Sequence, residues 1–390
     1  MSVATYHSNS GGRAFDTQSF DTILALTIST IILLGLVMVY SSGVAGNGRQ
    51  FGLTITHLIK HSAHIVAGVI MMAAVMMVRL DWLQNSSKVL LGAGILALLA
   101  LKIPGVGLEI NGSTRWFSLA GVRVQPAELM KLVCLIYVAD YYARKQSSVH
   151  LFKVGVLNVG VPIVMVGFLL LMQPDFGSLV VIVATTAGLM FLAGVPHKYF
   201  IAVIAITIIA LAAIAVLEPY RMDRLLTYQD PWADPFNKGF QLTQALMAVG
   251  RGGWLGVGLG NSLQKLSYLP HADNDFLIAI IAEELGAIGV MLVMGLFVVL
   301  LWRAFSIGQR ALQADMRFES YLAYGIGLLL VFNAGIHIGV NTGILPTKGL
   351  TLPLMSSGGS SMITSLIAIG LLFSVDRKSR AKPRKRGARA

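Results

Sequence analysis

About ten apolar runs, each close to the length of a membrane-spanning helix, constrain the fold of this sequence more than any other feature. The hydrocarbon core of a bilayer is about 30 Å thick, and roughly 20 helical residues are needed to cross it. Charged residues make up only 12% of the chain, whereas they are about a quarter of a soluble protein. We therefore predict an all-α, polytopic membrane protein with about ten transmembrane helices. The runs lie near residues 22–41, 57–78, 88–103, 126–143, 154–172, 177–195, 199–217, 276–302, 320–342 and 350–375.

An even number of spans places both termini on one side of the membrane, and the basic residues indicate which side. With cytoplasmic termini, the segments on the cytoplasmic side carry the larger share of the 30 lysines and arginines, as the positive-inside rule requires. This topology gives a cytoplasmic N-terminal segment (1–21) without a visible signal peptide and a transmembrane domain (22–375) with one long extracytoplasmic loop (218–276). The basic cytoplasmic tail (376–390) suits anionic lipids better than nucleic acid.

The polar residues capable of chemistry lie mainly on the extracytoplasmic side, whereas a transporter would place them at mid-bilayer. Asp273 and Asp275 end the long loop, directly before the apolar run that begins at Phe276. A carboxylate there could act as a general base toward a sugar hydroxyl or bind a divalent cation. Asn274 or Asp275 could equally be the N-cap of the following helix, and the spacing does not decide between these roles.

Two further charged pairs lie inside apolar runs. Glu128 and Lys131 are three residues apart, so a helix brings them together on one face as an ion pair. The pair either neutralises itself for burial or faces a cavity and a phosphate-bearing lipid, and we favour the second interpretation. Glu283 and Glu284 lie two turns into the helix after Asp275, and we expect them to make structural hydrogen bonds to a neighbouring helix.

Several other patterns have a structural and a functional interpretation. Arg115 and Lys348 stand in predicted loops, where they could bind phosphate or remain solvated. The glycine-rich segment 250–260 lacks the Gly-Lys-Ser or Gly-Lys-Thr of a nucleotide-binding loop, so tight turns against the membrane face are expected. Ser356 to Ser361 has no nearby base and favours close helix packing. The helical spacing of His57, His61 and His64 indicates a stripe of interfacial histidines rather than a metal site.

Taken together and in their order, five motifs resemble those of the SEDS family (shape, elongation, division and sporulation), which are polytopic peptidoglycan glycosyltransferases. The resemblance extends from the first apolar run to about residue 375. Segment 264–270 looks more like the division members of the family than like the elongation members. The motifs are Gly112-Ser-Thr-Arg-Trp-Phe117, Gln125-Pro-Ala-Glu-Leu-Met-Lys131, Gln173-Pro-Asp-Phe-Gly-Ser178, Ala248-Val-Gly-Arg-Gly-Gly-Trp-Leu-Gly-Val-Gly-Leu-Gly260, and Pro346-Thr-Lys-Gly349 with Met355-Ser-Ser-Gly-Gly-Ser-Ser361.

This resemblance implies an activity and assigns roles to residues. Members of the family polymerise lipid II into glycan strands on the outer face of the cytoplasmic membrane. Their essential aspartate maps to Asp275, and their functionally important glutamate and lysine map to Glu128 and Lys131. Arg115 and Lys348 match further characteristic positions, and we count all four as candidate substrate-binding residues.

The sequence departs from the family pattern directly before Asp275. The family usually reads Pro-Glu-Ala-His-Thr-Asp-Phe, whereas this chain reads Pro270-His-Ala-Asp-Asn-Asp-Phe276. Asp273 therefore occupies the histidine position, and His271 occupies the glutamate position. This makes Asp273 a candidate substrate-binding residue, second carboxylate or metal ligand. The resemblance specifies no cofactor, and a divalent cation such as Mg²⁺ or Mn²⁺ is compatible with the carboxylates.

The resemblance also implies partners and a location. Lipid II is the expected substrate, and a single-pass class B penicillin-binding transpeptidase and other division proteins are the expected partners, at the division septum of the inner membrane. Two alternatives stay open beside septal polymerisation. One is an elongation-type polymerase, and the other is a flippase or transporter of the lipid-linked precursor, whose charges would line a path between both faces.

Overall fold

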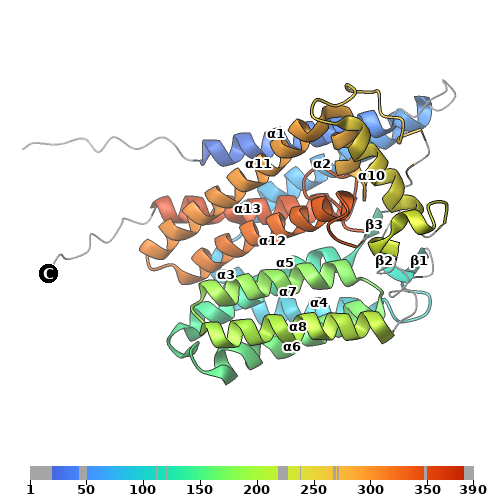
Figure 1. Ribbon diagram of the computed structural model, residues 1–390. Helices are drawn as coiled ribbons and strands as arrows, with labels where there is room; N and C mark the ends of the chain where they lie inside the picture. Colours follow the sequence, from blue (N-terminus) through green and yellow to red (C-terminus); the bar gives the residue numbers. More distant parts are fainter. Residues whose placement is uncertain are drawn as a thin grey trace, which may run out of the picture.

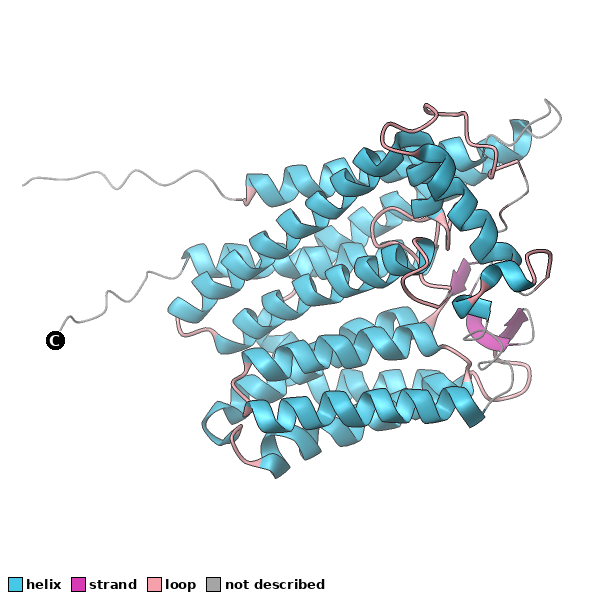
Figure 2. Ribbon diagram, viewed as in Figure 1, coloured by secondary structure: helices cyan, strands magenta, loops and turns pink. Residues whose placement is uncertain are grey.

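The computed structural model is a bundle of helices that run side by side, with short strands and loops gathered at one end (Figures 1 and 2). It describes residues 20–43, 51–110, 113–119, 122–217, 227–237, 239–266, 269, 272–346 and 349–381. Each predicted apolar run falls on a helix. These helices are α1 (Thr22–Gly43), α2 (Phe51–Met77), α4 (Ser87–Ala100), α5 (Pro126–Lys145), α6 (Asn158–Met172), α7 (Phe176–Leu192), α8 (His197–Leu217), α11 (Leu277–Gln313), α12 (Arg317–Asn341) and α13 (Gly359–Ala381).

Short elements connect these helices. A five-residue π-helix precedes α6 and continues it toward the N-terminus. The others lie in the connections, two of them in the long loop before α11. They are α3 (Leu80–Asn85), a 3₁₀ turn at Gln146–Ser148, the π-helix at Lys153–Leu157, a 3₁₀ turn at Pro231–Ala233, and α10 (Phe240–Gly252).

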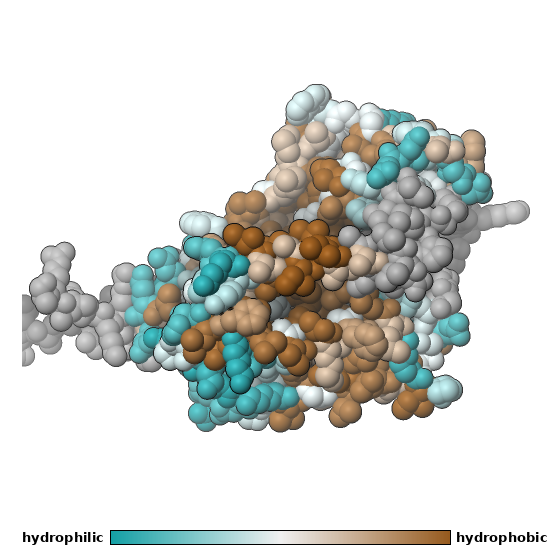
Figure 3. Space-filling view, turned by 60° about the horizontal axis from the view of Figure 1, so that its bottom comes forward, coloured by the Kyte–Doolittle hydropathy of each residue, from teal (hydrophilic) through white to brown (hydrophobic). Residues whose placement is uncertain are grey.

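The protein is a multi-pass membrane protein. Among the described residues, six helices are long and apolar enough to cross a bilayer, and three shorter helices are also apolar. Figure 3 shows hydrophobic side chains in a broad band across the middle of the molecule, with hydrophilic residues toward its ends. The six helices lie at Thr22–Gly43, Ile55–Met77, Lys153–Met172, Leu277–Gln313, Arg317–Asn341 and Gly359–Ala381.

The two ends of the bundle differ in character. Asp21, directly before α1, and Asp376, near the end of α13, are buried carboxylates that share a set of arginines. Asp21 accepts hydrogen bonds from Arg303, and Arg310 lies 2.6 Å from Asp376. Arg380 binds Asp376 at 2.9 Å and lies 3.7 Å from Asp21. We call this the terminal end, because the start of α1 and the end of α13 meet here; the sheet and α10 define the opposite, loop end.

The all-α membrane fold is confirmed, with one addition that was not predicted, a small sheet at the loop end. Three short strands form an antiparallel sheet in the order β1-β2-β3. Several of their residues are β-branched or aromatic, which suits a strand, but the segment lies between two strong helical runs, and its sequence predicts a loop. The strands are β1 (Leu108–Ile110), β2 (Ser113–Leu119) and β3 (Val122–Val124).

The last predicted run, 350–375, begins too early. Residues 349–358 form a loop, and α13 starts only at Gly359. Pro353 cannot donate a helical hydrogen bond, and Leu354 has a φ of 63°, outside the helical region. Leu350 is buried inside the protein. The apolar composition of this segment therefore predicted its burial correctly, but the prediction that it is helical is wrong.

A break at Gly286 divides α11 into a short first segment and a long second one. Gly286 has φ 69° and ψ −168°, a conformation that essentially only glycine adopts. The break deprives two helical carbonyls and two amides of their partners, and the glycine-rich segment 250–260 supplies replacements. The bonds join Val257 N to Glu283 O (2.9 Å), Gly258 N to Glu284 O (3.0 Å), Ala287 N to Gly253 O (2.9 Å) and Ile288 N to Trp254 O (3.3 Å).

This arrangement confirms tight turns and close packing for the glycine-rich segment. Gly253, Gly256, Gly258 and Gly260 all have positive φ. A Cβ on Gly256 would overlap the backbone of α11 at Glu284. The loop thus replaces the helix's own hydrogen bonds, and it fixes the short segment 277–285 on which the candidate site depends.

Candidate active site

The candidate site lies at the loop end, where the starts of α5, α7, α11 and α13 meet the end of α12. The loop 349–358 and the first turn of α13 link these elements. Ser356 Oγ donates to the carbonyl of Asn274 at 2.8 Å, in the loop before α11. Ser360 Oγ accepts from the amide of Gln125 at 3.0 Å, directly before α5. One serine-rich segment therefore brings the two halves of the predicted site together.

Asp275 is half-buried at this junction. The Nδ2 of Asn274 donates to its Oδ1 at 3.0 Å. A Cβ on Gly349 would lie 3.1 Å from its Oδ2, so glycine at that position lets the loop approach the carboxylate. The alternative that Asp275 or Asn274 is the N-cap of α11 is wrong, because the N-cap is Phe276 and no side chain of that residue caps the helix.

The cap comes instead from Asn341, at the end of α12. Its Oδ1 accepts from the amide of Ala279 at 3.1 Å, and its Nδ2 donates to the carbonyl of Asp275 at 3.1 Å. His337, one turn earlier, places Nε2 3.3 Å from the carbonyl of Asn274. Neither residue was predicted from the sequence. Their only signal was a pair of polar side chains four apart at the end of an apolar run.

Asp273 binds a different neighbour from Asp275. Its Oδ2 accepts from Ser357 Oγ at 2.7 Å, and its carbonyl accepts from Ser357 N at 3.2 Å. His57 Nδ1 lies 3.6 Å from the same Oδ2. The histidine stripe on α2 therefore meets a carboxylate that is remote in sequence, and Asp273 fastens the loop before α11 to the loop before α13.

The predicted ion pair on α5 is present. Lys131 Nζ lies 2.8 Å from Glu128 Oε1, and the two side chains are only 3% and 9% exposed. Both lie in the first two turns of the helix, after Pro126 at its start. A buried pair of this kind is costly to break, because removing one partner leaves an uncompensated charge.

Arg115 is held by backbone carbonyls. From β2 it donates Nε to the carbonyl of Gln173 at 2.8 Å and Nη2 to that of Pro174 at 3.0 Å. The neighbouring Asp175 caps α7 and accepts from Gln125 Nε2 at 3.3 Å. Arg115 thus ties the sheet to the turn between α6 and α7. Lys348, another predicted substrate-binding residue, and His271 lie outside the described residues.

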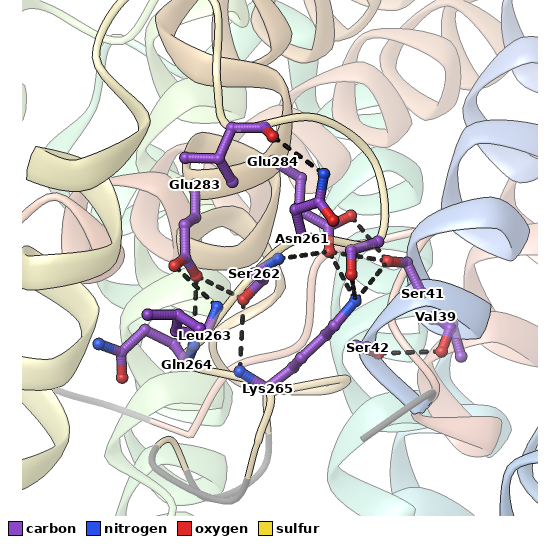
Figure 4. Close-up of polar contacts among 12 residues, drawn as sticks. Val39, Ser41, Ser42, Asn261, Ser262, Leu263, Gln264, Lys265, Glu283 and Glu284 are labelled. Carbon is purple, nitrogen blue, oxygen red and sulfur yellow. Dashed lines mark hydrogen bonds and ion pairs between the residues drawn. The ribbon is translucent and has the colours of Figure 1, made fainter. Parts of the chain in front are cut away.

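Glu283 and Glu284 are structural, as expected. Both are fully buried in the short first segment of α11. Glu283 binds Arg251 at 2.6 Å, and Glu284 binds Lys265 at 3.1 Å and Ser41 Oγ at 2.7 Å. Figure 4 shows the loop 261–265 wrapped around the two carboxylates, with Ser41 of α1 on the far side. The pair fastens the long loop and α1 to α11.

Comparison with known proteins places this architecture in one family. The sequence model of a family described as "Cell cycle protein", which covers FtsW, RodA and SpoVE, matches residues 21–381. The chain belongs to the FtsW/RodA/SpoVE family. The resemblance to the SEDS family seen in the sequence is therefore confirmed.

Curated relatives and solved structures agree with this membership. The chain is 47% identical over 347 residues to the probable peptidoglycan glycosyltransferase FtsW of Nitrosococcus halophilus, covering 89% of each chain. It is 47% identical over 367 residues to that of Nitrosomonas europaea, covering 93% of this chain and 94% of the relative.

Two solved structures share the fold. One belongs to a study of how a peptidoglycan synthase complex coordinates polymerization and crosslinking, with a TM-score of 0.76, 27% identity, and coverage of 92% of this chain and 98% of that one. The other is RodA of Thermus thermophilus, with a TM-score of 0.67, 26% identity, and coverage of 92% and 97%.

The site of this family member offers no ready metal centre within the described ranges. No group of three or more His, Cys, Asp and Glu side chains there is arranged to hold a metal ion. Asp273 is occupied by Ser357 and faces His57. Because Mg²⁺ can be held by one or two carboxylates together with substrate phosphates, this leaves the question of a cation to the chelator test, and we derive no step that needs one.

Proposed function

We propose that this protein is a peptidoglycan glycosyltransferase that polymerises lipid II into glycan strands for septal cell-wall synthesis. Family membership and the names of the relatives support this proposal. The observation that carries it is the position of Asp275. Its backbone carbonyl accepts a hydrogen bond from Asn341 of α12, and its half-buried carboxylate lies beside Gly349 in the loop before α13. A fixed carboxylate at a partly solvated lip is what a general base needs.

In the proposed reaction, Asp275 removes the proton from the acceptor sugar hydroxyl. The hydroxyl oxygen attacks the anomeric carbon of the donor, and the bond from that carbon to the pyrophosphate oxygen breaks. The lipid pyrophosphate leaves with the electron pair, so the leaving group needs little acid catalysis. Attack from the face opposite the pyrophosphate inverts the anomeric centre. Asp275 then releases the proton to water.

The developing negative charge of the pyrophosphate calls for cations nearby. Lys131, paired with Glu128, is the buried candidate on α5. Arg115 uses Nε and Nη2 on backbone carbonyls, although a guanidinium carries five N–H donors. Lys348 is the third candidate, and Asp273 positions the loop between the two halves of the site. Together with Glu128, these four residues form the proposed substrate-binding set.

The proposed topology has ten spans with both termini in the cytoplasm. The basic residues of the terminal end support this orientation, because the ends of α5, α11 and α13 and the start of α12 all carry arginine or lysine there. The loop end then faces outward, where lipid II polymerisation takes place. These residues are Arg144, Lys145, Arg303, Arg310, Arg317, Lys378 and Arg380.

Partner and location follow the same proposal. A solved structure of the same fold comes from a complex that coordinates polymerization and crosslinking, which supports a class B penicillin-binding transpeptidase as the partner here. The relatives named FtsW are 43–47% identical to this chain, whereas RodA of Thermus thermophilus is 26% identical. This difference favours the division septum of the inner membrane over cell elongation.

Polymerisation of labelled lipid II by the purified protein with its transpeptidase partner tests the proposal. We expect Asp275→Ala to lower the rate of polymerisation by about 10²–10⁴-fold, the usual contribution of a general base. In a separate translocation assay in sealed vesicles, we expect the wild-type protein to transport no lipid II. Wild-type polymerisation by Asp275→Ala would refute the assignment of the base. Transport without polymerisation would favour the flippase. A chelator arm asks whether a divalent cation contributes.

A further inference from the structure

We propose that Asn341 is the positioning residue of Asp275 and that His337 assists it, an inference that rests on the proposed role of Asp275 as general base. Both residues lie on α12, more than 60 positions away in the sequence. Neither is suited to touch the substrate, because both are buried, at 0% and 1% exposure. Their effect on the reaction would pass through the backbone of Asn274 and Asp275.

The amide of Asn341 is fixed at both of its polar atoms. Nδ2 donates to two carbonyls, that of Asp275 at 3.1 Å and that of His337 at 2.8 Å. Oδ1 accepts from the amide of Ala279 at 3.1 Å. Reversing the amide would set oxygen against two carbonyls and nitrogen against an N–H, so only one orientation satisfies all three bonds. Asn341 therefore holds the Asp275 carbonyl in one place.

The same side chain also caps α11. The N-cap residue of α11, Phe276, has no side chain that can accept from the first turn. The amide of Ala279 donates to the Phe276 carbonyl at 3.0 Å and to Asn341 Oδ1, which supplies the side-chain acceptor from a neighbouring helix. The start of α11 and the residue directly before Phe276 are thus anchored to α12 by one group.

His337 and Ser356 hold the preceding carbonyl from two sides. His337 Nε2 lies 3.3 Å from the Asn274 carbonyl, and because a carbonyl only accepts, that nitrogen must carry the proton. Ser356 Oγ donates to the same oxygen at 2.8 Å. Two consecutive carbonyls are therefore fixed, and the carboxylate of Asp275 can move only by rotation of its own side chain. General-base catalysis is sensitive to such placement, because about 1 Å of misplacement can cost about 100-fold.

A merely structural role for Asn341 needs a matched control, and α12 contains one. Asn333 lies two turns earlier on the same helix and is buried at 5% exposure. Its Oδ1 has no hydrogen-bond partner among the described residues. Asn333→Ala removes the same side chain from the same helix without touching the loop before α11. It measures the effect of loosening α12 alone.

The test measures kcat and KM for lipid II and the thermal midpoint, with the full-length protein in complex with its partner. We expect Asn341→Ala to lower kcat by about 10–100-fold with KM within about twofold, while Asn333→Ala keeps kcat within about threefold. His337→Ala should lower kcat, and His337→Gln, which retains a donor, should recover part of it. If Asn341→Ala does not fold, the kcat values of the two His337 variants decide whether α12 positions Asp275.

Three results would overturn the proposal. They are equal losses of activity in Asn341→Ala and Asn333→Ala, a change in Asn341→Ala that is confined to KM, and a wild-type kcat in His337→Ala. Asp275→Asn in the same assay separates this failure from failure of the proposed function. Full activity of Asp275→Asn refutes the base itself. An inactive Asp275→Asn beside an active Asn341→Ala refutes only the positioning role. We also expect no further loss when Asn341→Ala is added to Asp275→Asn, since the two residues act as one unit.

Discussion

Two acidic pairs stand less than three turns apart in the chain and have opposite surroundings. Glu283 and Glu284 are fully buried, and each contacts a cation. Asp273 and Asp275 are only half-buried; Asp273 accepts from Ser357, and Asp275 accepts from Asn274. The same carboxylate chemistry therefore fastens elements together in the first pair and, in the second, supplies the proposed general base, Asp275.

The difference arises from the break in α11. The glycine-rich loop inserts at Gly286 and carries Arg251, Ser262 and Lys265 onto the glutamates. At the start of the helix, Asn341 of α12 fixes the backbone. Burial with full pairing suits a carboxylate to a structural role, whereas backbone fixation at a partly solvated lip suits Asp275 to the proposed role of general base.

The largest expected loss of stability follows Glu284→Gln. The substitution leaves Lys265 Nζ, whose side chain is 3% exposed, without its counter-charge, and breaking a buried pair costs about 3–5 kcal/mol of unfolding free energy. Chemical unfolding in detergent measures it. The matched control, Asp273→Asn, removes a carboxylate that is 23% exposed and should change stability by less than about 1 kcal/mol. Equal losses of stability in the two variants would contradict the proposed difference between the glutamate pair and the aspartate pair.

The loss of stability from breaking the Glu128–Lys131 pair on α5 should lie between the losses of Glu284→Gln and Asp273→Asn. Glu128→Gln leaves Lys131 buried and uncompensated, at a cost of about 2.5–3.5 kcal/mol. Glu128→Gln with Lys131→Met removes both charges and should recover most of the stability, because the buried ion is gone. We expect lipid II polymerisation to stay low in this double variant. A stable and fully active double variant would assign the pair to structure alone.

A smaller effect is expected at the break itself. Gly286→Ala forces a side chain into a conformation that costs about 1–3 kcal/mol, and its Cβ would overlap the Gly256 amide and the Trp254 carbonyl. Thermal unfolding measures the loss. Gly295→Ala, later in the same helix with nothing within 4 Å, should be neutral or stabilising by up to about 1 kcal/mol. Similar effects of both substitutions would show that the break is not needed.

The smallest effect concerns an exposed carboxylate at the terminal end. The hydrogen bond and charge of Lys378 hold the pKa of Asp81 below its usual value. A lowered folded-state pKa contributes stability above the unfolded-state pKa of about 3.9, and the contribution is lost as pH falls through the folded-state value. Because Asp81 is 57% exposed, solvent limits it to about 0.2–1 kcal/mol. Asp81→Asn should remove this part of the pH dependence of the unfolding free energy between pH 5 and 2, which chemical unfolding measures. If Asp81→Asn leaves that pH dependence unchanged, Asp81 does not make this contribution.

The parts of the molecule that the sequence predicted are those set by local pattern. Apolar runs predicted helices because backbone groups in a bilayer must bond within the segment, and three-residue spacing predicted the Glu128–Lys131 pair. The contribution of Asn341 could not be predicted, because its partners Ala279 and Asp275 are 62 and 66 positions away. The loop before α13 was missed for a similar reason: its leucines are buried by tertiary packing, which hydropathy does not distinguish from a helix.

The contrast between the two acidic pairs is tested most directly by measuring lipid II polymerisation and thermal unfolding on Asp275→Asn and Glu284→Gln in one preparation with the transpeptidase partner. We predict that Asp275→Asn unfolds like the wild type and polymerises at least about 100-fold more slowly, and that Glu284→Gln unfolds at a clearly lower temperature. Wild-type polymerisation by Asp275→Asn, together with wild-type unfolding of Glu284→Gln, would contradict the account.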